Sequence, residues 1–508
     1  LALASQAHTL PLETMLDIIT GTPDTITIGD FTSPLFMHYF GSETIDTEQY
    51  LTLIESLRTI RGKLREYSPN EVLYITDFLR YIELHQQTGI GITNVRKFAD
   101  SQTGAINLLT AHKSKGLEYP HVYVMGAVDT TWGEKVRNKS RLISYPKNLN
   151  IAPAGDTYNE RLRLFYVAMT RARQYLTISY ALADTNGKPL LPAAFLTGTS
   201  LTAVHQPMSP LNQTLQQALV DWRGMLANNP TKPMKDLLAP ALESYKLSAT
   251  HLNNFIDVTK GGPQYFLLNN LLHFPSAKSP SAQYGTAIHA TIQRVHNEVK
   301  AGGKRPVEDA LHEFENILTN EHLATADHEY YLKKGLNSLT KFLESHYASF
   351  TKTQKTELGF GGQNVTVNGA KLTGSLDLVD ITGSAVTVTD YKTGNPAASW
   401  KGSGEYEKIK LHKYRQQLMF YQLLVQNSRD YAKYQFNGGV LQFVEPDNAG
   451  NIHALKAEFT ADDLQRFTAL ITSVWQCITT FDLPDTTNYE PTLKGILAFE
   501  QDLIDKFS

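Results

Sequence analysis

Apolar residues recur at helical spacing through much of the first hundred residues. The stretches at 50–67 (YLTLIESLRTIRGKLREY) and 70–89 (NEVLYITDFLRYIELHQQTG) place apolar side chains every three or four positions, which is the period of an amphipathic helix. Gly89 and Gly91 then end the second stretch, as glycines commonly do at a helix terminus. The pattern predicts a helical region over residues 1–105.

The pattern changes after this region. Residues 106–110 (INLLT) and 121–128 (HVYVMGAV) are short strand candidates with β-branched side chains. A helix is predicted at 159–175 (NERLRLFYVAMTRARQY), and a further strand at 176–182 (LTISYAL). Strands that alternate with helices are typical of a parallel α/β layer, which we expect over residues 106–185.

The next segment, residues 186–245, is rich in Pro, Gly, Ser, Thr and Asn, and it predicts a linker with one helix at 211–226. A new domain is expected over residues 246–508. It opens with KLSATHLNNFI, in which Ser248 is the expected helix N-cap. Further helices are predicted up to about Ser349.

Three strand-like stretches follow, at 364–369 (NVTVNG), 371–381 (KLTGSLDLVDI) and 385–394 (AVTVTDYKTG). The segment TGS between the last two is a turn signal, so these two stretches predict a β-hairpin. A strongly amphipathic helix is predicted downstream at 413–426 (KYRQQLMFYQLLVQ).

Composition limits the class of protein. A chain of 508 residues with 42% hydrophobic and 19% charged residues is expected to form two to four globular domains. No apolar run approaches the ~20 residues that a membrane helix needs. The first residues lack a basic segment before an apolar stretch, so we expect no signal peptide. The sequence begins without Met, and we expect it to be a piece of a longer chain.

Cysteine content and net charge add two further limits. Cys477 is the only cysteine, which excludes a disulfide framework or a four-cysteine metal site within one chain and fits a reducing cytoplasm. The formal net charge is −3, so a nucleic-acid surface would have to be a local patch.

The most informative segment is GSLDLVDITGSAVTVTDYKTG. The predicted hairpin brings Asp377 and Asp390 together, and Lys392 shares a strand face with Asp390 because side chains alternate along a strand. Two carboxylates and a lysine on one face are unusual unless a cation compensates their charge. Oxygen ligands suit Mg²⁺ or Mn²⁺, and such an ion can activate water and stabilise charge on a phosphate.

An isolated D-x-K pattern is short and common, and it would ordinarily be a surface hairpin with scattered charges. Four further residues change that assessment: His289, on a helix expected to begin after Gly285, then Glu357, Gln417 and Tyr421. Gln417 and Tyr421 share one helical face at i, i+4. Each of these residues alone is weak evidence, and a lone helical histidine is more often a core or surface residue than a ligand.

In this order, GTAIH, TELGF, GSLD, DYKTG and QLMFY closely resemble the motifs of RecB-like PD-(D/E)XK nucleases. The resemblance covers nearly all of residues 246–508 and implies a restriction-endonuclease-like mixed sheet flanked by helices. It implies metal ligation by His289, Asp377, Asp390 and the backbone carbonyl of Tyr391. Lys392 would be the catalytic lysine, with Glu357, Gln417 and Tyr421 supporting the site or the DNA.

The sequence departs from this family where relatives often carry cysteines for an iron–sulfur cluster. Here the corresponding place reads TKGGPQYFL, with Gly262 before Pro263. Cys477 alone cannot hold a cluster. We therefore expect no iron–sulfur cluster.

A second resemblance lies in INLLTAHKSKGLEYPHVYVMG and NERLRLFYVAMTRARQYLTISY. These are similar to motifs V and VI of superfamily 1 helicases of the UvrD, RecB and AddA group. The resemblance implies a partial RecA-like α/β domain over 106–185, and residues 1–105 resemble, more weakly, the inserted 2B-type helical subdomain. It places four residues near nucleotide and two near DNA: Gly116, Glu118, Arg163 and the arginine finger Arg171, then His112 and Lys113.

The sequence contains no G-x-x-x-x-G-K-(S/T) motif, the loop that cradles nucleotide phosphates. In the resembled helicases that loop belongs to an N-terminal RecA-like domain. We therefore expect ATP hydrolysis only together with that helicase half or with a separate ATPase subunit.

Three functional hypotheses follow from the sequence. The first is a DNA exo- or endonuclease that processes DNA ends in repair or recombination, with DNA as its partner and no membrane association. The second is an inactive nuclease-fold module that docks DNA or an ATPase subunit. The third is an RNA-directed enzyme, because a metal site that reads phosphates is indifferent to the base. Retention of His289, Asp377, Asp390 and Lys392 favours the first hypothesis.

Overall fold

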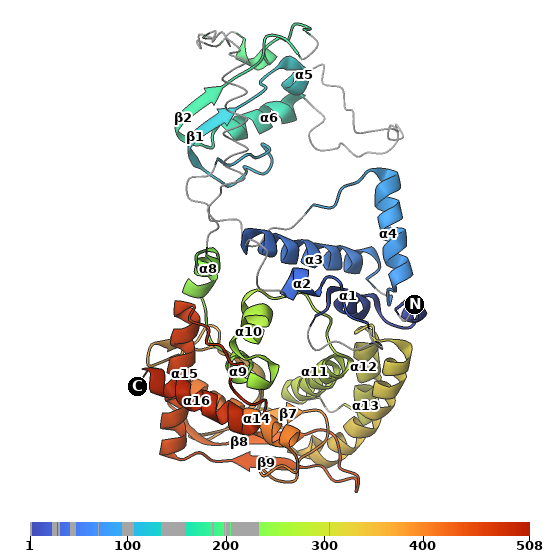
Figure 1. The fold of residues 1–508 in the computed structure, drawn as a ribbon, viewed down its shortest axis with the longest axis vertical. Helices are drawn as coiled ribbons and strands as arrows, with labels where there is room; N and C mark the ends of the chain where they lie inside the picture. The colour runs from blue at the N-terminus through green and yellow to red at the C-terminus, as the bar shows by residue number, and fades with distance from the viewer. Residues whose placement is uncertain are drawn as a thin grey trace. The chain divides into compact units, whose positions relative to one another are not determined.

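The structure is a computed structural model in which the chain forms two compact units, residues 1–100 with 230–508 and residues 101–229. We call them the first and the second unit and describe each by itself (Figure 1). The structure describes residues 3–22, 28, 31–40, 47–69, 71–93, 106–133, 158–184, 187–197, 199, 204, 233–303 and 305–507.

The first unit begins with helices, as the apolar spacing predicts. The long helices are α1 (Leu12–Thr20), α3 (Thr47–Tyr67) and α4 (Ile75–Thr88). Gly89 ends α4 in a left-handed conformation with φ 66°, which glycine adopts without steric cost. Two short elements accompany them: η1 (Ala4–Gln6) and α2 (Phe36–Phe40).

These N-terminal helices pack on the C-terminal part of the same unit. Ile54 of α3 is fully buried in the main hydrophobic core. Asp17 of α1 forms a buried ion pair with Arg61 of α3 and accepts a hydrogen bond from Ala277 N at 2.8 Å. Arg58 donates to the Leu272 carbonyl at 2.8 Å. The helical region therefore shares a core and polar contacts with the domain that follows it.

A five-stranded sheet organises that domain, in the order β3-β6-β7-β8-β9. Only the β7–β8 pair is parallel, and the other neighbours are antiparallel, so the sheet is mixed, as the nuclease resemblance implies. The strands are β3 (Lys355–Gly359), β6 (Ser375–Thr382), β7 (Ala385–Lys392), β8 (Gln435–Phe443) and β9 (Ala454–Ala457). The predicted hairpin is confirmed, with Thr382 opposite Ala385.

Helices cover both faces of this sheet, because alternate strand residues point into two different apolar clusters. One cluster takes Leu376 and Val388 together with α9 (Ala249–Ile256), α14 (Glu405–Gln426), α15 (Ala461–Thr480) and α16 (Leu493–Phe507). The other takes Leu378 and Tyr391 together with α11 (Pro280–Ala301), α12 (Val307–Thr319) and α13 (Thr325–His346).

Helix starts in this domain follow local capping chemistry. Ser248 caps α9 as predicted, its hydroxyl accepting from His251 N at 3.2 Å. The expectation that the His289 helix begins after Gly285 is wrong, since α11 begins at Pro280. Ser279 accepts from Ala282 N at 3.2 Å, and a proline suits the first helical position because its missing N–H has no helical partner there.

Shorter elements complete the first unit. Helix α8 lies within the stretch predicted as linker, and its residues Leu238 and Leu242 are buried in the main core. The elements are α8 (Met234–Glu243), η3 (Val258–Lys260), α10 (Pro263–Phe266), η4 (Leu267–Leu271), η5 (Tyr347–Ser349), β4 (Thr366–Val367) and β5 (Ala370–Lys371).

The second unit contains the predicted parallel pair of strands, β1 (Tyr119–Val124) and β2 (Ala172–Ile178). Between them in sequence lies α6 (Tyr158–Met169), whose Phe165 is fully buried. Its short helices are α5 (Asp129–Trp132) and η2 (Ala194–Leu196).

Two predictions for the second unit are wrong. Residues 106–110 form no strand, and Ile106 is 97% exposed, because a short apolar run becomes a strand only when another strand pairs with it. The helix predicted to run to residue 175 ends at Met169, since the residues after it pair with β1 instead. The helix predicted at 211–226 lies outside the described residues.

No helix among the described residues is long and apolar enough to cross a membrane.

Candidate functional site

The β6–β7 hairpin sets the position of the two predicted carboxylates. Leu378 lies opposite Thr389, and this antiparallel register, continued by one residue, places Asp377 opposite Asp390. The Tyr391 backbone N–H donates to Asp377 Oδ2 at 2.8 Å. The strand pairing predicted from sequence therefore brings both carboxylates to one end of the sheet.

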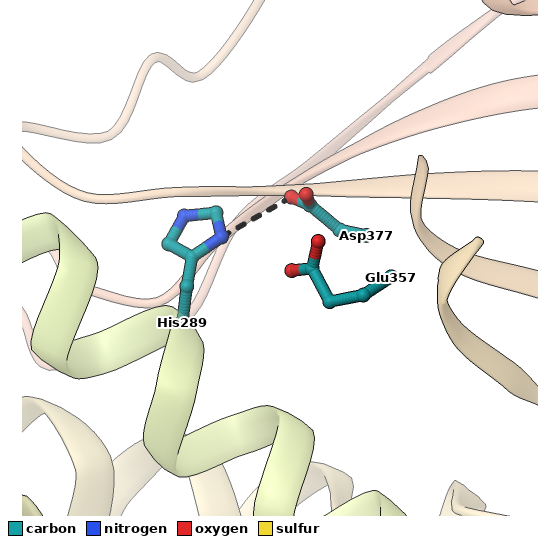
Figure 2. Close-up of side chains that lie close together, drawn as sticks. All are labelled: His289, Glu357 and Asp377. Atoms are coloured by element: carbon teal, nitrogen blue, oxygen red, sulfur yellow. Dashed lines mark ion pairs between the residues drawn. The ribbon is translucent and has the colours of Figure 1, made fainter. Parts of the chain in front are cut away.

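Three side chains from three elements converge there (Figure 2). His289 of α11, Glu357 of β3 and Asp377 of β6 each place one ligand atom within 4.8 Å of the other two. His289 Nδ1 lies 3.4 Å from Asp377 Oδ2. One imidazole nitrogen and two carboxylates at this spacing form a set that can hold a divalent cation.

Glu357 adopts an unusual backbone conformation inside its strand, with φ 47°. A left-handed conformation is unfavourable for a residue with a Cβ, and such strain clusters at functional sites. The Ser375 hydroxyl donates to Glu357 Oε2 at 3.2 Å. The kink directs an exposed carboxylate toward His289 and Asp377, which regular strand geometry would not guarantee.

The spacing of Gly285 and His289 has a packing explanation. They are four residues apart on α11 and therefore share a helix face. A Cβ on Gly285 would lie 3.3 Å from Thr393 Oγ1, so the glycine lets α11 approach the segment that follows β7. That approach brings His289, one turn later, to Asp377.

A hydrogen-bonded network surrounds the second carboxylate. Asp390 is 2% exposed, and its Oδ1 accepts from Tyr421 Oη and Gln417 Nε2, each at 2.9 Å. Lys392 Nζ lies 2.7 Å from Asp390 Oδ2 and donates to Gln417 Oε1 at 2.8 Å. The Lys392 ammonium also lies 4.6 Å from the centre of the Tyr414 ring. Gln417 therefore connects Asp390, Lys392 and Tyr421 through the two ends of one amide.

The electrostatics of the site favour a cation. Burial raises the pKa of Asp377 to about 8, and the neighbouring Asp390 raises it further. Burial lowers the pKa of His289, which keeps the imidazole neutral and able to ligate a metal. A divalent ion would offset the repulsion between the carboxylates and let Asp377 ionise. These residues therefore fit a hard divalent metal such as Mg²⁺ or Mn²⁺.

The seven predicted side chains form two adjoining groups. His289, Glu357 and Asp377 make up the first, and Asp390, Lys392, Gln417 and Tyr421 make up the second. Tyr391 joins them through its N–H to Asp377 and through a backbone hydrogen bond that favours protonated His289. The Tyr391 ring points elsewhere, with its hydroxyl 3.0 Å from His296 Nε2.

Sequence reasoning missed Glu445, whose side chain accepts a hydrogen bond from Gly394 N at 2.7 Å. The only signal available was an acidic residue directly after the apolar end of a strand, LQFVE. Such a residue ordinarily marks solvent, whereas Glu445 is 4% exposed.

The predicted helicase residues lie in the second unit. Arg171 donates to the Leu117 carbonyl at 3.2 Å and to the Val167 carbonyl at 3.1 Å, which places it beside the segment of Gly116 and Glu118. Gly116 has φ 84°, and Glu118 lies 4.0 Å from Arg173. The remaining three, Arg163, His112 and Lys113, are exposed.

Comparison with known sequences identifies two regions. The PD-(D/E)XK nuclease superfamily matches residues 246–490, and the UvrD-like helicase C-terminal domain matches residues 37–183. The helicase match thus begins in the helices of the first unit and continues through the second.

Two curated relatives and one solved structure illustrate the similarity. DNA helicase II of Escherichia coli (strain K12) is 30% identical over 138 residues, 26% of this chain and 16% of the helicase. An ATP-dependent helicase/nuclease polypeptide of Geobacillus thermodenitrificans is 28% identical over 151 residues, 26% of this chain and 12% of that polypeptide. The crystal structure of a candidate exonuclease from Eubacterium rectale aligns with 50% of this chain and 88% of its own, at 12% identity and a TM-score of 0.33.

The matched stretches therefore span less than a fifth of the length of these curated relatives.

Proposed function

Because residues 246–490 belong to the PD-(D/E)XK nuclease superfamily and residues 37–183 to the UvrD-like helicase C-terminal domains, we propose that this chain is a metal-dependent DNA nuclease joined to part of a helicase. Its role would be to process DNA ends in repair or recombination. The observation that carries the proposal is the convergence of His289, Glu357 and Asp377 beside the Asp390–Lys392 pair.

His289, Glu357, Asp377 and Asp390, with the Tyr391 carbonyl, would hold Mg²⁺ or Mn²⁺. When bound, the ion would lower the pKa of a water ligand and stabilise negative charge on the scissile phosphate. Water oxygen then bonds to phosphorus, the P–O bond to the leaving nucleotide breaks, and the leaving oxygen takes up a proton.

The chain's own residues supply positioning. Tyr421 and Gln417 fix one oxygen of Asp390, so the other oxygen has a defined direction. Lys392 lies beside that second oxygen at 2.7 Å, where its ammonium can donate to the attacking water or to a phosphate oxygen. The aromatic ring of Tyr414 and the amide of Gln417 keep the ammonium from turning to solvent.

The second unit would contribute to an ATPase rather than to cleavage. Arg171 is held by two backbone carbonyls, so its guanidinium is pre-positioned, as an arginine finger must be. Its phosphate would be bound by a P-loop domain that this sequence does not contain. ATP binding and hydrolysis would therefore require the N-terminal helicase half or a separate ATPase subunit.

The test is cleavage of labelled linear single-stranded and duplex DNA without ATP, in Mg²⁺, Mn²⁺ or EDTA. The parent chain should cut with metal and not in EDTA, and Asp390→Ala should not cut. A suitable control is Lys355→Ala, because Lys355 lies in the same sheet over the Tyr431 ring at 5.0 Å and contacts neither Asp377 nor Asp390. Absence of cleavage with either metal would overturn the proposal, and full activity of Asp390→Ala would overturn the site.

A further inference from the structure

A buried carboxylate lies just outside the proposed active site and has no part in the cleavage chemistry described above. Glu445 follows β8, and its side chain is 5% exposed. The residue before it, Val444, donates its N–H to the Lys392 carbonyl at 2.9 Å. The backbone that carries Glu445 is therefore paired directly with the last residue of β7.

The two oxygens of Glu445 have different partners. Oε1 accepts from Gly394 N at 2.7 Å, and Oε2 lies 3.0 Å from Lys334 Nζ of α13. Lys334 in turn lies over the ring of Tyr284 of α11, 5.4 Å from its centre. One carboxylate thus links the segment after the catalytic strand to the two helices that cover this face of the sheet.

The segment held in this way is short and adjoins the reactive residues. Gly394 is two residues after Lys392 and adopts φ 97°, a conformation that only glycine accepts readily. Thr393, between them, lies against Gly285 of α11. The end of β7 is therefore fixed on one side by close packing on α11 and on the other by the Glu445 hydrogen bond.

Burying a carboxylate is costly unless hydrogen bonds and a cation compensate, and an apolar side chain would fill the same volume without that cost. Both compensating groups are present here. Neither of them is needed for the apolar core, which suggests that the carboxylate serves the segment it holds.

We propose that Glu445 is a positioning residue, which fixes Gly394 and thereby the placement of Lys392 and Asp390 for cleavage. This inference rests on the proposed nuclease function. Residues that orient reactive groups from behind typically change metal affinity or activity by about 10- to 100-fold when they are replaced.

The test compares Glu445→Ala with Glu500→Ala. Glu500 is an equally buried carboxylate that accepts from His412 Nε2 at 2.7 Å and from Gln416 Nε2 at 2.8 Å, so it ties α16 to α14 and leaves Gly394 untouched. Glu445→Ala should lower kcat by about 10- to 100-fold and leave KM for DNA near the parent value. Glu500→Ala should lower the melting temperature while kcat stays close to that of the parent.

A rescue variant separates the hydrogen bond from the buried charge pair. In Glu445→Gln combined with Lys334→Met, the amide oxygen can still accept from Gly394 N, and no unpaired charge remains. This double variant should recover most of the parent kcat. The inference is wrong if folded Glu445→Ala cleaves with the parent kcat, or if Glu500→Ala shows the same loss.

Hydrogen exchange and Mn²⁺ binding give readouts that do not depend on cleavage. In Glu445→Ala, amide exchange over residues 391–404 should accelerate by about tenfold or more while the core stays protected, and Mn²⁺ should bind more weakly. Unchanged exchange and unchanged Mn²⁺ affinity would overturn the positioning role. If the parent itself cuts no DNA, the proposed function fails, and these two measurements still decide whether Glu445 holds the site.

Discussion

The two units present their functional residues in different ways. In the first unit, the sheet is covered on both faces, and the residues proposed for cleavage come from α11, β3, β6, β7 and α14 of that unit. In the second unit, β1 and β2 leave large side chains at the surface, with Tyr123 at 69% and Tyr175 at 62% exposure. Its proposed nucleotide residues lie along one edge, without a phosphate-binding loop in the sequence.

This difference bears on what each unit can do. A site whose ligands, lysine and supporting amide belong to one core can reach its working geometry without help. An arginine finger acts only on a phosphate that another element has already bound. We therefore expect cleavage to depend on the first unit and ATP-linked behaviour to depend on what the second unit joins.

The largest expected effect separates the two units directly. Lys392→Ala should reduce cleavage by roughly 1,000-fold or more, because a donor to the charged transition state is lost. Arg171→Ala should leave ATP-independent cleavage unchanged. Both are measured as initial rates on labelled single-stranded DNA in Mn²⁺. Equal losses in the two variants would mean that the second unit takes part in cleavage itself.

The next effect concerns the support of Asp390. Tyr421→Phe removes a hydroxyl that donates to Asp390 Oδ1 at 2.9 Å and should lower kcat by about 10-fold. Tyr431→Phe is the control, since its hydroxyl accepts from Lys355 at 3.1 Å and does not reach Asp390. Single-turnover cleavage rates check both variants. An unchanged rate for Tyr421→Phe would show that Gln417 alone orients the carboxylate.

A smaller effect is expected from the close approach of α11. Gly285→Ala should lower the cleavage rate several-fold, because its Cβ would lie 3.3 Å from Thr393 Oγ1 and shift His289. Gly62→Ala on α3 is the matched control, with no atom within 4 Å of the added Cβ. That control should raise the free energy of unfolding by up to about 1 kcal/mol through helix propensity. Equal cleavage by both variants would remove the packing explanation for the Gly285–His289 spacing.

The smallest effect is on the pH dependence of stability. Burial raises the pKa of Asp377 from its ordinary 3.8 to about 8, so the folded metal-free protein binds this proton more tightly than the unfolded chain. The free energy of unfolding should therefore fall as pH rises from about 4 to about 8. Asp377→Asn cannot ionise, and its melting temperature without metal should exceed that of the parent by several degrees at pH 8 and by little at pH 4.

The control for this measurement is Asp380→Asn, on the same strand, where the carboxylate accepts only from Gln354 at 3.2 Å among the hydrogen bonds of the described residues. It should keep the pH slope of the parent. Added Mg²⁺ should raise the melting temperature of the parent at pH 8 and leave that of Asp377→Asn nearly unchanged. Parallel slopes for the parent and Asp377→Asn would contradict the raised pKa.

Much of the first unit could be predicted from its sequence because the signals there are local. Alternation of apolar residues and the TGS turn predicted the β6–β7 hairpin, and that hairpin alone places Asp377 opposite Asp390. The serine before the apolar run at 249–256 predicted the start of α9. The start of α11 was predicted five residues late, because the cap formed by Ser279 and Pro280 was given less weight than Gly285.

Signals in the second unit were less local, and two elements were predicted wrongly. Residues 106–110 have the composition of a strand but form none. Arg173 and Tyr175 continue the apolar spacing of α6, yet they belong to β2. In both places a neighbouring strand, rather than the segment's own pattern, decides the structure.

The sequence by itself determined which residues carry the chemistry and on which elements most of them lie, because motif order and residue periodicity are properties of the chain alone. Tertiary structure decided what these residues meet: the left-handed turn at Glu357 that directs its carboxylate to His289, the amide of Gln417 between Asp390 and Lys392, and the burial of Glu445 against Gly394. Those contacts join segments far apart in the chain. Their partners are selected by packing in three dimensions, which no local pattern of apolar and polar residues records.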